Sequence, residues 1–281
     1  MTVLTWKAKG GTVLVLTPHG DVVAEAGGQA DRPYVAGSTM KSFLLATALD
    51  AGLVKETDIF DCSNGLRRGK VMFDAAALEK ATLPELFAAS SNIGIAAVFD
   101  RVGGARYDHA LRAFHFATPP SLAAATAGDW DAALTAIGAS MSTTPRQVAR
   151  GYAALADGGD GIVTAQTAGR VTALLENVVA SEHGTGKRAR IAGVRVAGKT
   201  GTSEWTAEDG STATYASFVG YVPADEPRYV IFVGIASPTN DGAGGEVAAP
   251  VFARLATAAL ALSQCGELQP STLRTTCWVI G

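Results

Sequence analysis

Residues 34–52, Tyr-Val-Ala-Gly-Ser-Thr-Met-Lys-Ser-Phe-Leu-Leu-Ala-Thr-Ala-Leu-Asp-Ala-Gly, decide the fold of the chain around them. Gly37 is expected to break a preceding extended segment, and apolar residues at 44, 45, 48 and 49 recur at helical spacing. This pattern predicts a buried helix with Ser38 near its first turn, where free N–H groups and the positive end of the dipole would face an oxyanion. Lys41, three positions on, lies on the same helix face and can bring its nitrogen to the Ser38 oxygen.

Two further motifs distinguish this S-x-x-K pattern from a chance occurrence. Alone, the pattern is weak, because a serine followed by a surface lysine is ordinary in a helix. Ser90-Ser91-Asn92 supplies S-x-N and Lys199-Thr200-Gly201-Thr202 supplies K-T-G-T, each once in the chain. In this order the three form the motif set of serine acyltransferases of the penicillin-binding and β-lactamase type. The alternative interpretation of Ser90 and Asn92 is helix capping.

Composition sets the size of the fold and excludes several partners. With 281 residues and 48% hydrophobic content, the chain can bury the core of one large domain or two closely packed lobes. A net charge of −3 with 17% charged residues gives no polybasic surface, so neither nucleic acid nor an anionic membrane is expected as a partner.

The cysteines and histidines show no metal or redox pattern. Cys62, Cys265 and Cys277 lack C-x-x-C spacing, and the four histidines are scattered, so we expect no metal and no cofactor. Cys265 and Cys277 can close a loop only in an oxidising compartment, which the sequence leaves open.

Targeting signals are not evident in the chain. Residues 1–7 lack the basic and apolar regions of a signal peptide. The longest apolar stretch, Val247 to Leu262, is interrupted by Pro250 and Arg254, so no membrane span is expected. Either the chain works without an anchor, or a targeting sequence has been removed from it.

The order of the predicted elements indicates an α+β fold. Strands are expected at 11–16 and 21–25 as a hairpin, and at 195–199, 215–222 and 228–235 as an antiparallel meander. Between them, 83–158 is mostly helical, with apolar periodicity in 83–90, 93–102, 105–114, 130–137 and 146–156, and a short strand-like piece lies around Val71-Met72-Phe73. A final helix is expected at about 247–262, with an apolar face that can cover the sheet. Repeated βαβ units are not indicated.

The chain resembles the transpeptidase domain of class B penicillin-binding proteins, within the serine DD-transpeptidase and β-lactamase-like superfamily. Beyond the three motifs, the resemblance rests on Ala136-Ile137-Gly138 leading into Thr143-Thr144-Pro145, on 216–221, and on Ala248-Ala249-Pro250-Val251-Phe252, and it extends from about residue 11 to 262. It implies an antiparallel five-stranded sheet flanked by helices plus an all-α lobe. We expect a single transpeptidase domain at 1–262, with an α/β lobe at about 1–62 and 165–262, an all-α lobe at about 63–164, and a C-terminal tail at 263–281.

The motif residues receive specific expected roles. Ser38 is the expected nucleophile, and Lys41 can serve as its base only if burial and a neighbouring cation, for which Lys199 is the candidate, lower its pKa. Ser90 would complete the proton route to the leaving amine, and Asn92 would bond both Lys41 and a substrate amide. These roles make Ser38, Lys41, Ser90, Asn92 and Lys199 the expected catalytic residues.

The K-T-G-T segment is expected to bind the substrate. Lys199 and Thr200 would hold its free C-terminal carboxylate, with the Thr202 hydroxyl as a further donor. Gly201, lacking a Cβ, would let the substrate backbone lie against the strand as an added β-partner. The backbone N–H groups of Ser38 and Thr202 would form the oxyanion hole.

The expected function is a peptidoglycan DD-transpeptidase that is acylated by D-Ala-D-Ala stem peptides and covalently inhibited by β-lactams. A DD-carboxypeptidase or β-lactamase is the enzymatic alternative, although no glutamate is placed by a motif as a base for water. A non-catalytic β-lactam or muropeptide sensor is the third. The resemblance implies cell-wall synthesis proteins as partners and a periplasmic or extracytoplasmic location. Class B proteins usually carry a membrane helix and a pedestal domain before the transpeptidase, and neither is evident here, so an isolated catalytic domain is expected.

Overall fold

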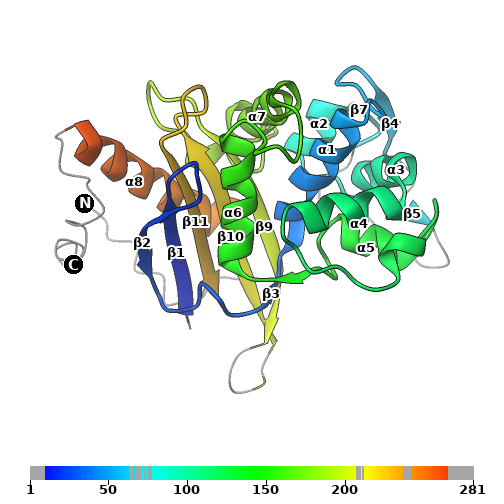
Figure 1. The fold of residues 1–281 in the computed structure, drawn as a ribbon, viewed down its shortest axis with the longest axis horizontal. Coiled ribbons are helices and arrows are strands. Elements are labelled where there is room, and N and C mark those ends of the chain that lie inside the picture. Colours follow the sequence, from blue (N-terminus) through cyan, green and yellow to red (C-terminus); the bar gives the residue numbers. More distant parts are fainter. Residues whose placement is uncertain are drawn as a thin grey trace.

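A five-stranded antiparallel sheet forms the centre of the computed structural model (Figure 1), which describes residues 10–63, 66–67, 71–72, 74, 78–206, 210, 212–236 and 242–264. Its strands are β1 (Gly10–Leu16), β2 (Val22–Ala26), β9 (Ala197–Thr206), β10 (Thr212–Val222) and β11 (Tyr229–Ala236), in the order β2-β1-β11-β10-β9. The N-terminal hairpin therefore joins the C-terminal meander through β1 and β11, with Val13 opposite Val233. The predicted five-stranded antiparallel sheet is confirmed, and β9 forms one of its edges.

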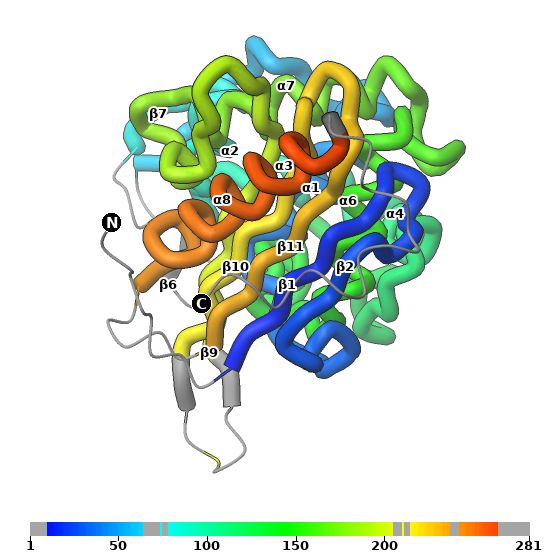
Figure 2. The backbone as a smooth tube through the Cα atoms, turned by 90° about the vertical axis from the view of Figure 1, so that its left-hand side faces the viewer, coloured from blue at the N-terminus to red at the C-terminus, as the bar shows by residue number. Residues whose placement is uncertain are grey.

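Successive side chains of the strands point to opposite sides of the sheet, and each side contributes to a buried core. On one side Ile231 and Val233 join Phe218 and Phe252 in a core under α8 (Gly244–Gln264), which lies across the strands in Figure 2. On the other side Phe232 belongs to the larger core shared with the helices, among them α6 (Pro145–Ala156). The sheet is thus the middle layer between α8 and the helical part.

The helical part contains α1 (Lys41–Asp50), α2 (Leu83–Ala88), α3 (Asn92–Val102), α4 (Gly104–Ala113), η2 (Leu122–Ala124) and α5 (Trp130–Ala136). The side chains of residues 41–49 in α1 are all buried, as expected of a central helix. The region predicted as all-α also holds three short strands. One is β7 (Lys80–Thr82), which pairs with β4 (Ile59–Asp61) just before the region, and the others are β5 (Leu66–Arg67) and β6 (Val71–Met72), which pair with each other. The predicted strand-like piece is therefore β6, while Phe73 lies outside the described residues.

One long helix, α7 (Ala165–Ala180), was not predicted from the sequence. It begins at an N-cap, Thr164, whose hydroxyl accepts from the Thr167 N–H, and it buries Val171, Leu174, Leu175 and Val178. These positions have the helical spacing that would have identified it. It packs beside β9 and α1 and is followed by η3 (Lys187–Ala189).

The final helix is longer than predicted and strongly apolar. Over Gly244–Ser263 its mean hydropathy is 1.4, so by length and composition it passes the test for a membrane span, and 28% of its most apolar window is buried within the protein. Ala248, Phe252 and Ala256 face the sheet, which explains part of this apolar character. The expected C-terminal tail beyond 264, with Cys265 and Cys277, lies outside the described residues.

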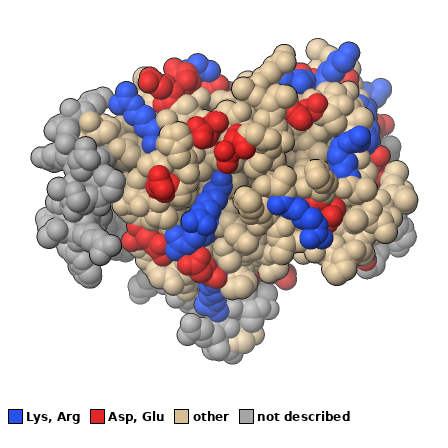
Figure 3. Space-filling view, in the orientation of Figure 1, with Lys and Arg blue, Asp and Glu red and all other residues tan. Residues whose placement is uncertain are grey.

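Charged side chains on the surface are mostly interspersed. Figure 3 shows basic and acidic groups scattered among neutral ones on the face it presents. Arg146, for example, pairs with Glu25 and Asp31, and Arg195 pairs with Glu176. This distribution agrees with the small net charge of the sequence.

A short extended segment leads the chain into the Ser38 turn. β3 (Tyr34–Val35) pairs with β8 (Ser142–Thr143), and the 3₁₀ helix η1 (Gly37–Met40) follows directly. The Gly37 N–H donates to the Gly138 carbonyl at 3.1 Å. Gly138 has φ +82°, and a Cβ there would lie 1.9 Å from the Gly37 carbonyl oxygen. Glycine at 138 therefore permits the contact that holds the start of η1.

We expect Gly138→Ala to destabilise the protein by roughly 1–3 kcal/mol and to impair any reaction at Ser38, because the new methyl group displaces Gly37. Gly128→Ala is the matched control, since Gly128 has φ +86° but a Cβ there would have no heavy atom within 4 Å. The measurements are the thermal unfolding temperature of each variant and the extent to which an acylating reagent labels Ser38 covalently in each. Equal losses of labelling in the two would contradict the proposed contact.

Candidate active site

The three sequence motifs converge in the structure on the hydroxyl of Ser90. The amine of Lys41, at the start of α1, lies 3.3 Å from Ser90 Oγ. The amine of Lys199, on β9, lies 2.8 Å from the same atom. Segments more than a hundred residues apart are thus joined at one oxygen, and both lysine side chains are fully buried.

The Lys41 amine is held by the turn between α2 and α3. Its shortest contacts are to the Ser90 carbonyl and to Asn92 Oδ1, both at 2.7 Å, with the Ser91 carbonyl at 3.4 Å. A neutral amine has two hydrogens, which these two short contacts use, leaving its lone pair free. Within the described residues, no hydrogen bond joins Lys41 to the Ser38 hydroxyl, where the sequence analysis expected one.

The pKa values of both lysines are lowered, chiefly by burial. Burial lowers the pKa of Lys41 to about 7, while the charge of Asp74 opposes this shift. Burial also lowers the pKa of Lys199 well below its ordinary value, and the nearby charge of Lys41 adds to this effect. Of the two causes expected at Lys41, burial is present and is the main one. The charge of one lysine acts instead on Lys199, whose pKa is lowered by Lys41.

The helix cap in the S-x-N motif is its middle residue. Ser91 is the N-cap of α3, and its hydroxyl accepts from the Gly94 N–H at 2.9 Å. The capping alternative thus applies to Ser91, whereas Ser90 and Asn92 direct their side chains to the lysines. Ser90 has φ +59°, which is uncommon for a residue with a Cβ. Such backbone strain clusters at functional sites.

Asp74 supports this turn and was not predicted from the sequence. Its Oδ1 accepts from the backbone N–H groups of Asn92 at 2.5 Å and Ile93 at 3.1 Å, and its Oδ2 accepts from the Ser91 hydroxyl. A carboxylate at these free N–H groups is favoured by hydrogen bonding and by the helix dipole. Because Asp74 is 17 residues before Ser91 in the chain, no local pattern indicated this contact.

Ser38 lies half-buried in η1, one turn before the α-helix proper. The Tyr152 hydroxyl donates to the Thr39 carbonyl at 3.0 Å and is hydrogen-bonded to Ser42 Oγ at 2.6 Å. No role was predicted for Tyr152, and in the structure it joins α6 to η1 and α1. The backbone on both sides of Ser38 is therefore anchored.

The K-T-G-T strand passes directly beside η1. A Cβ on Gly37 would lie 3.3 Å from the Thr202 nitrogen, so the backbones that carry Ser38 and Thr202 are adjacent. A Cβ on Gly201 would lie 2.4 Å from Ser217 Oγ and 3.0 Å from Thr39 Cγ2. Glycine at 201 is thus required for the packing of η1 on the sheet. The sequence-based expectation was a different one, that glycine lets a substrate backbone lie against the strand. The edge position of β9 leaves the expected strand pairing with a substrate open.

The two threonines of this strand have their own hydrogen bonds. Thr200 is buried, and its Oγ1 lies 3.4 Å from the Lys199 amine and 2.9 Å from Thr185 Oγ1. Thr202 is exposed, and its Oγ1 accepts from the Gly244 N–H at 3.1 Å.

The Lys199 amine also lies 5.6 Å above the Phe87 ring, a distance at which the ring face favours a cation.

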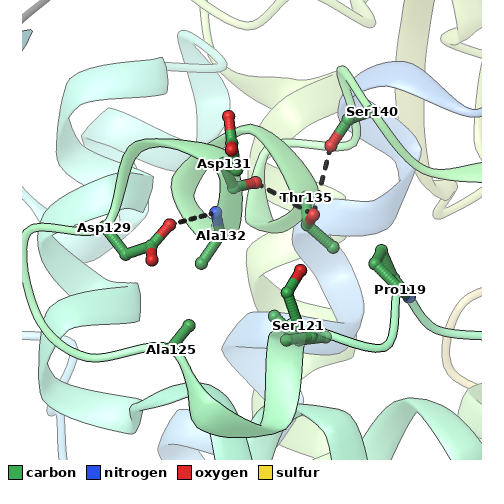
Figure 4. A pocket seen from close by; sticks show the side chains of 9 residues that line it. Pro119, Ser121, Ala125, Asp129, Asp131, Ala132, Thr135 and Ser140 are labelled. Carbon is green, nitrogen blue, oxygen red and sulfur yellow. Dashed lines mark hydrogen bonds between the residues drawn. The ribbon is translucent and has the colours of Figure 1, made fainter.

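Two cavities in the described part of the chain lie apart from these residues. One of about 260 Å³ is lined by Ser121, Thr135 and Ser140 among others, whose hydroxyls surround the hollow in Figure 4. Another of about 590 Å³ is lined by His19, Arg150 and Asp157 among others. No predicted site residue lines either cavity.

Metal binding needs clustered ligands, and thiol chemistry needs an accessible, acidic cysteine. Among the described residues, no group of three or more His, Cys, Asp or Glu side chains is placed to hold a metal ion. Cys62 is a buried free thiol whose pKa is raised by burial.

Comparison with known proteins agrees with these motifs. The family model described as "Penicillin binding protein transpeptidase domain" matches residues 2–257. The chain is 29% identical to the probable peptidoglycan D,D-transpeptidase FtsI of Caulobacter vibrioides over 79% of its own length and 45% of that protein. It is 28% identical to penicillin-binding protein PbpB of Mycolicibacterium smegmatis over 89% and 48%, respectively. The chain thus spans about half the length of the curated relatives it matches.

Solved structures show the same fold. The transpeptidase domain of Burkholderia pseudomallei penicillin-binding protein 3 superposes with a TM-score of 0.78 at 26% identity, covering 92% of this chain and 89% of that one. Mycobacterium tuberculosis penicillin binding protein 3, solved in complex with aztreonam, gives a TM-score of 0.77 at 25% identity, covering 94% of this chain and 75% of that one.

We expect Asp74→Ala to lower stability by about 1 kcal/mol through loss of its hydrogen bonds to the Asn92 and Ile93 N–H groups at the start of α3, and to slow any reaction that uses Lys41. Because the Asp74 charge raises the pKa of Lys41, its removal should also move the rising limb of the pH–rate profile to lower pH. Asp129→Ala removes a comparable N-cap, that of α5, and is the control. Stability measurements and pH profiles of both variants test this. An unchanged profile for Asp74→Ala would refute the electrostatic part.

Proposed function

Because this chain belongs to the penicillin binding protein transpeptidase domain family, we propose that it is a serine-type peptidoglycan D,D-transpeptidase. The observation that carries the proposal is the convergence of the Lys41 and Lys199 amines on Ser90 Oγ, beside η1. The substrate class is a stem peptide that ends in D-Ala-D-Ala, and β-lactams are covalent ligands of the same serine. The relatives named as D,D-transpeptidases support this choice of reaction.

In the acylation step, Ser38 Oγ attacks the carbonyl carbon of the penultimate D-Ala. Its proton passes to the neutral Lys41 amine, and the backbone N–H groups of Ser38 and Thr202 stabilise the oxyanion. Collapse of the tetrahedral intermediate breaks the C–N bond, and the proton passes by way of Ser90 Oγ to the leaving D-Ala amine. Asn92 holds Lys41 through its Oδ1, which leaves its NH₂ group for a substrate carbonyl.

In the second step, an acceptor amine attacks the ester carbonyl of the acyl-enzyme, a new amide C–N bond forms, and the ester C–O bond to Ser38 breaks. The proton lost by that amine returns along the Ser90 and Lys41 route to Ser38, which restores the enzyme. Hydrolysis would need a base for water. Asp74, the carboxylate that interacts with Lys41, is already bonded to Asn92, Ile93 and Ser91, which favours aminolysis over hydrolysis.

Domain organisation and location follow from the same proposal. We propose one transpeptidase domain at 1–262, with its reaction centre where β9 of the α/β lobe meets η1 and the α2–α3 turn, and a tail at 263–281. Peptidoglycan stem peptides lie outside the cytoplasm, so an extracytoplasmic location and contact with other cell-wall synthesis proteins are part of the proposal.

We expect a fluorescent penicillin to form a covalent adduct on Ser38 that is abolished in Ser38→Ala and retained in the control Ser121→Ala, which changes an exposed serine. Mass spectrometry of the digested protein locates the adduct. An adduct that decays over hours indicates a transpeptidase, and decay within seconds indicates a β-lactamase. Cross-linked products from a stem pentapeptide and an acceptor amine support the proposal. An adduct without cross-linking or trimming points to a sensor.

The acylation rate should rise about tenfold per pH unit below pH 7 and level off above it, because only neutral Lys41 can take the Ser38 proton. A base whose pKa is lowered gains its neutral form as the pH rises through that value, so the rate rises with pH. Stopped-flow acylation by a penicillin between about pH 5 and 9 tests this, with buffer hydrolysis of the same compound as control. A rate that still rises about tenfold per pH unit up to pH 9 would contradict the prediction, because it would mean that the base titrates near the ordinary lysine pKa of about 10.

A further inference from the structure

Thr185 lies next to the proposed carboxylate site, yet the reaction scheme gives it no role. It is half-buried in the loop between α7 and η3, and its N–H donates to the Ala88 carbonyl at 3.0 Å. Its Oγ1 lies 2.9 Å from Thr200 Oγ1. The loop is therefore fixed by its backbone in a position where the Thr185 hydroxyl reaches the β9 threonine.

The hydrogen count at Thr200 decides what Thr185 can do. A threonine hydroxyl has one hydrogen and two lone pairs. The Lys199 amine, at 3.4 Å, donates to Thr200 Oγ1, and in its protonated form it has no lone pair with which to accept. If Thr185 donates as well, both lone pairs of that oxygen are used, and the Thr200 hydrogen is free for a third group. A carboxylate, which only accepts, is the group that such a hydrogen suits.

Thr202 is oriented in the same way by α8. Its Oγ1 accepts from the Gly244 N–H, so its own hydrogen is also free to donate. A Cβ on Gly244 would lie 2.4 Å from the Gly201 carbonyl oxygen, and one on Gly245 would lie 2.1 Å from the Thr185 carbonyl oxygen. This glycine pair lets the start of α8 approach both β9 and the Thr185 loop.

We propose that Thr185 is a positioning residue for recognition of the substrate's C-terminal carboxylate, acting through Thr200. Its hydroxyl donates to Thr200 Oγ1 and thereby makes Thr200 a hydrogen-bond donor toward the carboxylate. The inference rests on the proposed function, and it adds a determinant of selectivity for free-acid substrates over neutral ones. Chains of hydroxyls polarised by a charged donor strengthen one another, which is the physical basis of the effect.

The test compares acylation of Ser38 by a penicillin free acid with acylation by its methyl ester. For Thr185→Val, which keeps the β-branched shape and removes the hydroxyl, we expect the free-acid rate to fall about tenfold and the ester rate to change less than about twofold. Thr185→Ser should retain the wild-type ratio of the two rates. Thr172→Val is the matched control, because it removes an α7 hydroxyl that bonds Tyr221 at 2.7 Å, and its ratio should equal that of the wild type.

An unchanged acid-to-ester ratio in Thr185→Val, or an equal fall of both rates, would overturn the inference and leave Thr185 a structural role. If Thr185→Val fails to fold, Thr185→Ala gives the same readout. A wild-type protein with equal rates for acid and ester also overturns it. A wild-type protein that is not acylated on Ser38 by either compound instead overturns the proposed function, so the two failures are distinguishable.

Discussion

Two buried amines that meet at one serine hydroxyl are the interaction on which the rest of this structure depends. An ammonium group without partners costs several kcal/mol in a protein interior, so each amine requires oxygen acceptors around it. For Lys41 these are the carbonyl of Ser90 and the side chain of Asn92, and for Lys199 they are Ser90 and Thr200. The start of α1, the α2–α3 turn and the edge strand β9 must therefore keep hydrogen-bond distances to one another.

The surrounding fold supplies a separate anchor for each of these elements. Asp74 binds the N-terminus of α3, and Tyr152 binds η1 from the side of the sheet. Gly138 admits the carbonyl of Gly37 at the entrance to η1. The left-handed backbone of Ser90 persists because the lysines on one side and the Asp74 contacts on the other determine its position. Sites held on the ends of packed helices and strands keep their geometry better than sites on free loops.

Local sequence patterns were sufficient to predict the helices and strands that bury one face with a regular apolar period. The N-terminal hairpin, the C-terminal meander and five helices between 83 and 156 were predicted in this way and are present. The predicted helical region ended at the glycine-rich stretch 158–161 and so missed α7, although its apolar positions from 171 to 179 have helical spacing. The small β4–β7 and β3–β8 pairs were missed because strands of two or three residues have no detectable period.

The side chains that meet around Ser90 were predictable from the sequence, whereas the residues that support them were not. The motifs named Lys41, Asn92 and Lys199, because each motif has a fixed spacing on its own element. Asp74, Tyr152 and Thr185 act through contacts that join distant segments, and each is of a common residue type in an ordinary local sequence. Burial was expected as a cause of the lowered Lys41 pKa, but the opposing charge of Asp74 became evident only in the structure, because Asp74 reaches the site from a distant segment.

Under the proposed function, the hydroxyl of Ser90, which contacts both amines, couples substrate binding to the protonation of Lys41. A substrate carboxylate at Thr200 and Thr202 places a negative charge beside Lys199, and an opposite charge raises the pKa of an amine. A proton then held by Lys199 lowers the pKa of Lys41, because the two amines lie at 2.8 and 3.3 Å from the same oxygen. Binding of the correct substrate therefore shifts the proton from Lys41 toward Lys199. Under the proposed function, a ligand without the carboxylate would lose reaction rate as well as affinity, so one charge both selects the substrate and prepares the base that acts on it.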